Sequence, residues 1–153
     1  MTILGIDPGS IRIGFGVIEK KGGSLTHINS GIVKILRESP LNSLERGLTE
    51  LLEKERPQLV GIEKLFFAKN RKTALKVAES RGVIMNTVLK SGVPLVEVAP
   101  SEVKLALTGS GRASKKAVFK MVKIFLGLKT GPVLDDASDA LAIAIAVSNK
   151  QQG

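Results

Sequence analysis

The sequence predicts an α/β fold with a mixed five-stranded sheet, in which three antiparallel strands are followed by two parallel ones. Three apolar segments joined by short turns begin the chain, helical and strand segments then alternate, and helical segments close it. Short turns favour antiparallel neighbours, whereas strands separated by a helix pair in parallel. We expect residues 1–153 to form a single domain, because this length suits one hydrophobic core and no repeat or linker interrupts it.

The strand segments are short, rich in Ile, Val and Leu, and bounded by turn-forming residues. They are expected at residues 2–6, 13–19, 25–35, 59–62 and 93–98. Asp7-Pro8-Gly9-Ser10 ends the first strand with residues typical of turns, and residues 20–24 form a hairpin-like loop between the second and third. Residues 59–62 are wholly apolar and lead into Glu63, which indicates a strand covered on both faces.

The helical segments are marked by apolar residues at helical spacing and by residues that start or stop helices. They are expected between Pro40 and Pro57 and at residues 71–90, 100–107, 114–126 and 136–148. The first carries one apolar face, formed by Leu41, Leu44, Leu48, Leu51 and Leu52. The second carries a broad apolar stripe, formed by Ala74, Ala78, Met85, Val88 and Leu89. Each pattern predicts an amphipathic helix.

Positive charge is concentrated in one part of the chain. The 23 Lys and Arg residues exceed the 14 Asp and Glu residues, which gives a formal net charge of +9. Residues 64–123 hold 13 basic and three acidic residues, a net of +10, whereas residues 1–63 hold eight of each. Such a concentrated excess indicates a surface for a polyanion, and nucleic acid fits best. A Lys-rich surface of the kind found in thermophilic proteins is the alternative.

Several classes of protein are excluded by what the chain lacks. It has no cysteine, so disulfides, thiolate metal sites and cysteine nucleophiles are excluded. No apolar segment approaches the roughly 20 residues of a membrane-spanning helix. The first residues lack the basic region and the small-residue cleavage site of a secretion signal, so we expect a cytoplasmic protein.

Four carboxylates fall where α/β proteins usually meet their ligands. Asp7 and Glu63 follow the first and fourth strands, and ligands bind at the carboxyl ends of strands in such sheets. Asp136 and Asp139 are three residues apart at the start of the last helix, so they share one face. If that helix packs beside the two strands, the four side chains converge.

Converging carboxylates repel one another, and their pKa values rise unless a cation lies among them. With no cysteine and one histidine in the chain, an oxygen-only cluster indicates a hard ion, Mg²⁺ or Mn²⁺. Two such ions about 4 Å apart can activate a water and stabilise the leaving oxygen of a phosphodiester. Each acid also has a simpler interpretation: Asp7 as a turn residue, Glu63 as the partner of a lysine, and Asp136 and Asp139 as residues that a helix dipole favours.

Five segments spread over the chain form a distinctive set. They are Gly5-Ile6-Asp7-Pro8-Gly9-Ser10, Ile62-Glu63, Phe66-Phe67-Ala68-Lys69-Asn70, Ala78-Glu79-Ser80-Arg81-Gly82-Val83 and Asp136-Ala137-Ser138-Asp139-Ala140-Leu141-Ala142-Ile143-Ala144. Together they closely resemble the RuvC family of Holliday-junction resolvases. The resemblance implies a ribonuclease H-like fold. It also implies that a catalytic acidic cluster, which binds two Mg²⁺ ions with Mn²⁺ as a substitute, is formed by Asp7, Glu63, Asp136 and Asp139.

The resemblance further implies a substrate and partners. RuvC-like enzymes are homodimeric endonucleases that use Mg²⁺ to cut two opposed strands of four-way DNA junctions symmetrically during recombination and repair. A branch-migration helicase complex of the RuvA and RuvB type is an additional implied partner. The apolar stripe of the predicted helix at residues 71–90 is a candidate dimer interface, with packing against the sheet as the alternative.

The candidate DNA-binding residues follow from the same resemblance and from the basic segment. Lys104 and Lys115 correspond to the family's phosphate-contacting lysines, and Phe66 to an aromatic residue that wedges or stacks at the junction centre. For Phe67, packing in the core is the preferred interpretation. Three further basic residues of the same segment complete the set: Lys69, Arg112 and Lys116.

Two other hypotheses stay open at this point. A DNA-binding module that has lost catalysis fits the charge, although four intact carboxylates argue against it. A nucleotide-binding phosphotransferase fits residues 5–10, which also resemble the phosphate loop of actin-like sugar kinases. Those kinases need two such domains around the nucleotide, and this chain has room for one.

Overall fold

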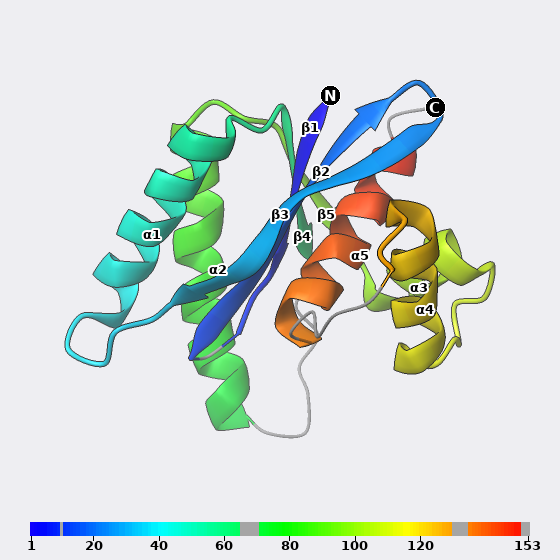
Figure 1. Cartoon of the computed structure of the whole chain (residues 1–153). Helices are drawn as coiled ribbons and strands as arrows, with labels where there is room; N and C mark the ends of the chain where they lie inside the picture. Colours follow the sequence, from blue (N-terminus) through cyan, green and yellow to red (C-terminus); the bar gives the residue numbers. More distant parts are fainter. Residues whose placement is uncertain (10, 65–70, 130–134, 151–153) are drawn as a thin grey trace.

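The computed structural model describes residues 1–9, 11–64, 71–129 and 135–150, which contain five strands and five helices (Figure 1). The strands are β1 (Thr2–Asp7), β2 (Arg12–Lys21), β3 (Ser24–Lys34), β4 (Leu59–Glu63) and β5 (Leu95–Val98). The helices are α1 (Pro40–Glu55), α2 (Arg71–Lys90), α3 (Pro100–Thr108), α4 (Lys115–Leu126) and α5 (Asp135–Lys150). The predicted α/β class is confirmed.

The strands form one mixed sheet in the order β3-β2-β1-β4-β5. β1 pairs antiparallel with β2, and β2 with β3, whereas β1 pairs in parallel with β4, and β4 with β5. The predicted arrangement of three antiparallel and two parallel strands is therefore confirmed. Ile6 lies opposite Ile62 in the parallel register, so the next residues, Asp7 and Glu63, end their strands at the same edge of the sheet.

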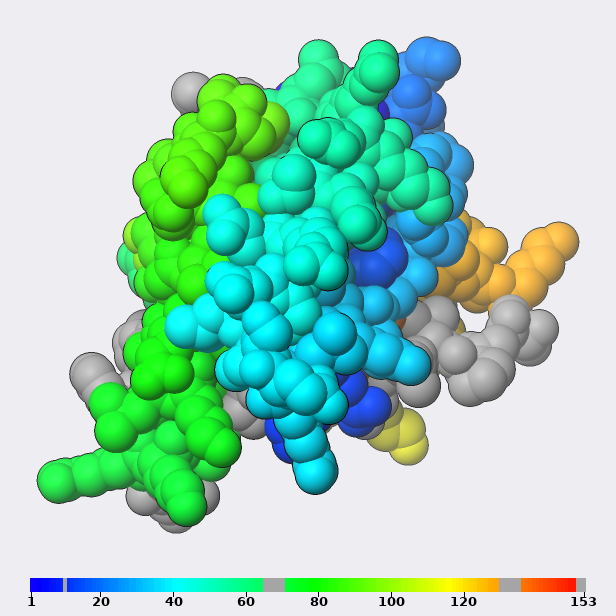
Figure 2. Space-filling view, turned by 90° about the vertical axis from the view of Figure 1, so that its left-hand side faces the viewer, coloured from blue at the N-terminus to red at the C-terminus, as the bar shows by residue number. Residues whose placement is uncertain are grey.

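Helices cover both faces of the sheet, as Figure 1 shows. α1 and α2 lie over one face, which is turned toward the viewer in Figure 2, and α3, α4 and α5 lie over the other. Each face buries its own apolar cluster. Leu44, Leu48 and Ile84 belong to the cluster under α1 and α2. Val122 and Leu141 belong to the cluster under α4 and α5. The sheet is thus apolar on both faces, as expected for its parallel part.

α5 lies unusually close to the sheet, because glycines face it. A Cβ atom on Gly5 of β1 would overlap the main-chain oxygen of Ala140, and one on Gly14 of β2 would overlap that of Asp136. These two glycines let the main chain of α5 approach the strands directly. The close approach holds the first turns of α5 beside the end of β1, where Asp7 lies.

The ends of several elements differ from the prediction. The loop between β2 and β3 is shorter than the expected residues 20–24, because Lys20, Lys21 and Ser24 pair within the strands. β5 begins at Leu95 and not at residue 93, since Pro94 has no N–H to donate to a neighbouring strand. Ser114, predicted as the first helical residue, instead caps α4: its hydroxyl accepts a hydrogen bond from the Ala117 N–H at 3.1 Å.

Two leucines assigned to apolar faces are exposed. Leu89, expected in the stripe of the second helix, is 62% exposed, and Leu41, expected on the face of the first, is 40% exposed. Leu41 lies in the first turn of α1 and Leu89 in the last turn of α2, next to the fully buried Val88, so Leu89 lies on the outer side of its helix. The buried positions of α2 are Ala74, Ser80, Ile84, Thr87 and Val88. Among the described helices, none is both long enough and apolar enough to cross a membrane.

Candidate active site

Three of the predicted catalytic carboxylates line one pocket at the carboxyl ends of β1 and β4. Asp7 is the last residue of β1, Glu63 is the last of β4, and Asp139 lies near the start of α5. The pocket has a volume of about 250 Å³ and is also lined by Lys104 of α3 and Lys115 of α4. Acidic and basic side chains predicted from distant parts of the sequence therefore meet in one place.

The remaining wall of the pocket is apolar. It is formed by Pro100, Val103, Val118, Ala142 and Ile143. Apolar surroundings remove water from the carboxylates and so disfavour their charged form. A cation that enters such a pocket gains more from each carboxylate than it would in bulk water, because the local dielectric constant is lower.

The acids of the site shift one another's proton affinity. Burial, followed by the negative charges of Asp139, Glu63 and Asp136, raises the pKa of the Asp7 carboxyl to about 8, and the nearby Lys115 opposes this shift. Burial, followed by the charge of Asp139, also raises the pKa of Glu63, and Lys104 opposes it. The four predicted carboxylates thus act as one electrostatic cluster, although they come from both ends of the chain.

The donors of this cluster fit a hard divalent cation. Each one is a carboxylate oxygen, the ligand type that Mg²⁺ and Mn²⁺ prefer, and a positive ion would offset the burial and the repulsion that together raise the pKa of Asp7. Among the described residues, however, no group of three or more His, Cys, Asp or Glu side chains is arranged so that it could hold a metal ion as it stands. The charge and chemistry fit, and the side chains must turn toward one another to bring their oxygens into a common coordination sphere.

Asp136 is held differently from the other three acids. It does not line the pocket, and its Oδ2 lies 2.7 Å from Nε of Arg12, the first residue of β2. Sequence reasoning missed Arg12, because an arginine at the start of a strand gives no sign of the helix that will pack beside it. The nearest sequence signal is Gly14, whose contact with the Asp136 main chain brings β2 against α5.

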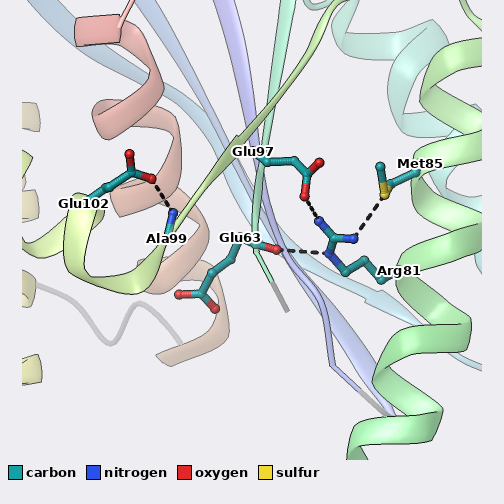
Figure 3. A network of polar contacts seen from close by, with 6 residues as sticks. All are labelled: Glu63, Arg81, Met85, Glu97, Ala99 and Glu102. Atoms are coloured by element: carbon teal, nitrogen blue, oxygen red, sulfur yellow. Dashed lines mark hydrogen bonds and ion pairs between the residues drawn. The ribbon is translucent and has the colours of Figure 1, made fainter. Parts of the chain in front are cut away.

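The two predicted phosphate-contacting lysines lie beside the acids. Nζ of Lys115 is 3.3 Å from Oδ2 of Asp139. Lys104 lies on α3, whose start is fixed by Glu102: the Ala99 N–H donates to Oε2 of Glu102 at 2.6 Å (Figure 3). This hydrogen bond, and then the contact with Lys150, holds the pKa of Glu102 below its usual value. Sequence reasoning did not single out Glu102, although an acid three residues after a helix start is a capping signal.

The other candidate DNA-binding residues fall into two groups. Arg112, in the turn between α3 and α4, and Lys116, in the first turn of α4, are exposed and do not line the pocket. Phe66 and Lys69 lie outside the described residues, as does Phe67. Lys104 and Lys115 are therefore the predicted DNA contacts that the structure places directly beside the carboxylates.

The chain matches one family model over nearly its whole length. Residues 3–147 match the family described as crossover junction endodeoxyribonuclease RuvC. The crossover junction endodeoxyribonuclease RuvC of Carboxydothermus hydrogenoformans is 44% identical over 156 aligned positions, which cover 100% of this chain and 99% of the relative.

Solved structures agree with the sequence matches. Thermus thermophilus RuvC in complex with a Holliday junction substrate is 33% identical, with a TM-score of 0.91 over 99% of this chain and 95% of that one. The yeast mitochondrial Holliday junction resolvase is 18% identical, with a TM-score of 0.71 over 98% of this chain and 78% of that one, and it shares the fold alone. The predicted ribonuclease H-like resolvase fold is confirmed by these neighbours.

Proposed function

Because the chain belongs to the RuvC family of crossover junction endodeoxyribonucleases, we propose that it resolves Holliday junctions by cutting two opposed strands symmetrically. One observation carries the proposal: Asp7, Glu63 and Asp139 share a pocket with Lys104 and Lys115. Carboxylates that can hold cations then lie next to lysines that can hold the scissile phosphate. We further propose that residues 1–153 act as one nuclease domain.

The catalytic role of the acids rests on their shared charge. We assign Asp7, Glu63, Asp136 and Asp139 as ligands of two Mg²⁺ ions, with Mn²⁺ as a substitute. When bound, such ions supply an activated water and stabilise the leaving oxygen of the phosphodiester. Asp7 and Glu63 end their strands at the same edge and are anchored by the sheet, so α5 is the element that brings Asp139 and Asp136 to them.

The lysines act on the acids and on the phosphate. Burial and the neighbouring acids raise the pKa values of Asp7 and Glu63, and Lys115 and Lys104 oppose these shifts, so both lysines favour the ionised form of the acids before DNA arrives. On the bound junction the same ammonium groups lie where charge builds up on the phosphate during cleavage. The wider DNA surface that we propose includes Phe66, Lys69, Arg112 and Lys116.

We propose two further assemblies. A homodimer suits a four-way junction, because a twofold axis places one active site at each of two opposed strands. A branch-migration helicase complex of the RuvA and RuvB type would deliver the junction. Sedimentation of the protein alone tests the dimer, and co-sedimentation with such a complex on a junction tests the second partner.

Junction cleavage is the direct test of the proposed function. A synthetic four-way junction, labelled on one strand at a time, is incubated with the protein and Mg²⁺, with EDTA in place of Mg²⁺, and beside a linear duplex of the same sequence. We expect paired nicks at symmetric positions in two opposed strands. They should appear on the junction and not on the duplex, and with Mg²⁺ and not with EDTA. Unpaired or duplex cutting, or cutting in EDTA, would contradict the proposal.

Two variants make the test specific. Asp7→Asn should abolish cutting and still bind the junction, because it removes a proposed ligand of the cations and leaves the lysines in place. Glu53→Gln, an exposed position on α1 over the opposite face of the sheet, is the matched control and should cut normally. If Asp7→Asn folds but loses junction binding, the assignment of Asp7 to catalysis is wrong.

A further inference from the structure

One arginine outside the pocket contacts the main chain of a proposed catalytic acid. The guanidinium of Arg81, on α2, has three partners in Figure 3. Its Nε donates to the main-chain oxygen of Glu63 at 3.2 Å, and another nitrogen pairs with Oε2 of Glu97 on β5. A third contact, at 3.2 Å, reaches the sulfur of Met85 one turn along α2. The Arg81 side chain is only 15% exposed, so these partners replace most of its water.

The contact between Arg81 and Glu63 lies at the last residue of β4. Glu63 pairs with Val98 in the parallel register, and the N–H of the next residue, Lys64, donates to the Val98 oxygen at 2.8 Å. Arg81 supplies the donor for the Glu63 oxygen from the α2 side. The last peptide group of β4 is thereby held on both sides, by β5 through Lys64 and by α2 through Arg81.

The two ends of Glu63 point in different directions. Figure 3 shows its main-chain oxygen directed at Arg81 and its carboxylate directed away from Arg81. Since Arg81 donates to the main chain and not to the carboxylate, it fixes where the side chain starts and leaves the carboxylate oxygens available. A shift of this peptide group would swing the carboxylate within the pocket that it lines with Asp7 and Asp139.

We propose that Arg81 is a positioning residue for Glu63, and that Glu97 orients Arg81 for this task. The inference rests on the proposed function, because it concerns the geometry of the acidic site. The planar guanidinium suits the role, since it donates in two directions from one rigid frame and so couples β5, β4 and α2. Groups that orient metal-ligating side chains in this way typically change metal affinity or activity 10- to 100-fold when removed.

A purely structural role makes a different prediction. α2 is anchored by the buried side chains of Ala74, Ile84 and Val88, which do not depend on Arg81. α2 also forms an ion pair with α1 through its last residue, since Nζ of Lys90 lies 3.6 Å from Oε1 of Glu45. Lys90→Gln therefore removes an ion pair from the same helix without touching Glu63, and it is the matched control for Arg81→Gln.

The experiment compares wild type, Arg81→Gln, Lys90→Gln and Asp7→Asn in three measurements at a temperature well below unfolding. They are the single-turnover rate of junction cleavage, junction affinity in EDTA, and Mn²⁺ binding without DNA, followed by electron paramagnetic resonance. For Arg81→Gln we expect a rate and an Mn²⁺ affinity lower by about 10-fold or more, with junction affinity in EDTA unchanged. Lys90→Gln should match wild type, and Asp7→Asn should lose both cleavage and Mn²⁺ binding.

Two further variants separate charge from geometry. Arg81→Lys keeps a positive charge but cannot reach Glu63 and Glu97 together, so we expect it to recover only part of the loss. Glu97→Gln leaves Arg81 without its ionic partner and should lower the rate and the Mn²⁺ affinity in the same direction. A melting temperature that falls in Arg81→Gln, with the cleavage rate and Mn²⁺ affinity of wild type, would overturn the inference. Failure of the wild type itself to cut the junction would instead overturn the proposed function.

Discussion

Nε of Arg12 lies 2.7 Å from Oδ2 of Asp136, so an ion pair links the first residue of β2 to the first turn of α5. Both partners are partly exposed: the side chain of Arg12 is 57% exposed and that of Asp136 is 32% exposed. An ion pair in such a setting contributes about 0–1 kcal/mol to stability. The pair also engages Asp136, the one proposed metal ligand that does not line the pocket.

Arg12→Gln should lower the Mg²⁺ concentration needed for half-maximal cleavage. The guanidinium competes with a cation for the Asp136 carboxylate, and removal of a unit charge at this partly exposed position changes cation binding roughly two- to tenfold. A Mg²⁺ titration of the cleavage rate measures this midpoint. Arg12→Lys keeps the charge and should stay close to wild type. A higher midpoint in Arg12→Gln would show that the ion pair orients Asp136 instead of competing for it.

Asp7→Asn should stabilise the protein at alkaline pH while it abolishes cleavage. The pKa of Asp7 is about 8 in the folded chain, against 3.8 for an unperturbed Asp. Between these values the unfolded chain releases a proton that the folded chain retains, so the unfolding free energy of wild type falls as the pH rises from about 4 to about 8. Asparagine has no such proton. We expect a gain of about 2–5 kcal/mol at pH 8 that shrinks toward pH 4.

Urea unfolding in EDTA, at several pH values across this range, measures the gain. Glu53→Gln, which removes a carboxyl at an exposed position of α1, is the control on the same preparations. A gain for Asp7→Asn that is the same at every pH would contradict the raised pKa of Asp7. In a parallel series, Mg²⁺ should raise the melting temperature of wild type and not that of Asp7→Asn, since a cation that binds only the folded state stabilises it.

The fold could be predicted largely from local patterns. The short turns between the first three strands predict antiparallel pairing, and the helix before residues 59–62 predicts parallel pairing for that strand. The register then places Asp7 and Glu63 at one edge. The patterns could not predict which positions of each helix are covered by neighbouring elements. Leu41 and Leu89 continue their apolar stripes in sequence but are exposed, and Leu89 is exposed although the neighbouring Val88 is fully buried.

The acidic residues of the site could be predicted from the sequence, but the arginines that contact them could not. Asp7 and Glu63 were found from their places after strands. The contacts of Arg12 with Asp136 and of Arg81 with Glu63 join elements that are distant in sequence, and they depend on how α5 and α2 lie on the sheet. An arginine at either position has no local sequence signature, because its partner is determined by how the elements pack and not by the distance between the two residues in the sequence.

Lys104→Gln and Lys115→Gln should each weaken junction binding and reduce its salt dependence. A lysine that contacts a phosphate releases about one counterion on binding, so the slope of log Kd against log salt should fall by about 1 for each variant. Binding titrations in EDTA at several salt concentrations measure the slope. Lys54→Gln, on the exposed side of α1, is the control and should leave the slope unchanged. An unchanged slope for either pocket variant would remove that lysine from the DNA surface.

The same two lysines should also shift the pH dependence of cleavage. Lys115 lowers the pKa of Asp7 and Lys104 lowers that of Glu63, so each substitution raises the pKa of a carboxyl that must ionise to hold a cation. The pH at which the single-turnover rate reaches half its maximum should therefore move upward in both variants. A profile that keeps its midpoint, with only a lower plateau, would mean that the lysines act on the phosphate alone.

Gly14→Ala should damage both stability and cleavage, because the new methyl group would overlap the main-chain oxygen of Asp136. Overpacking of this kind costs about 1–3 kcal/mol, and relief requires α5 to move away from the sheet together with Asp136 and Asp139. Gly82→Ala on α2 is the matched control: outside its own helix backbone and chain neighbours, no described atom lies within 4 Å of the added methyl group, so better helix propensity should stabilise it by about 0.5–1 kcal/mol. Urea unfolding and junction cleavage on the same preparations measure both effects. If Gly14→Ala unfolds and cuts like wild type, close approach of α5 to the sheet is not what holds its acids in the site.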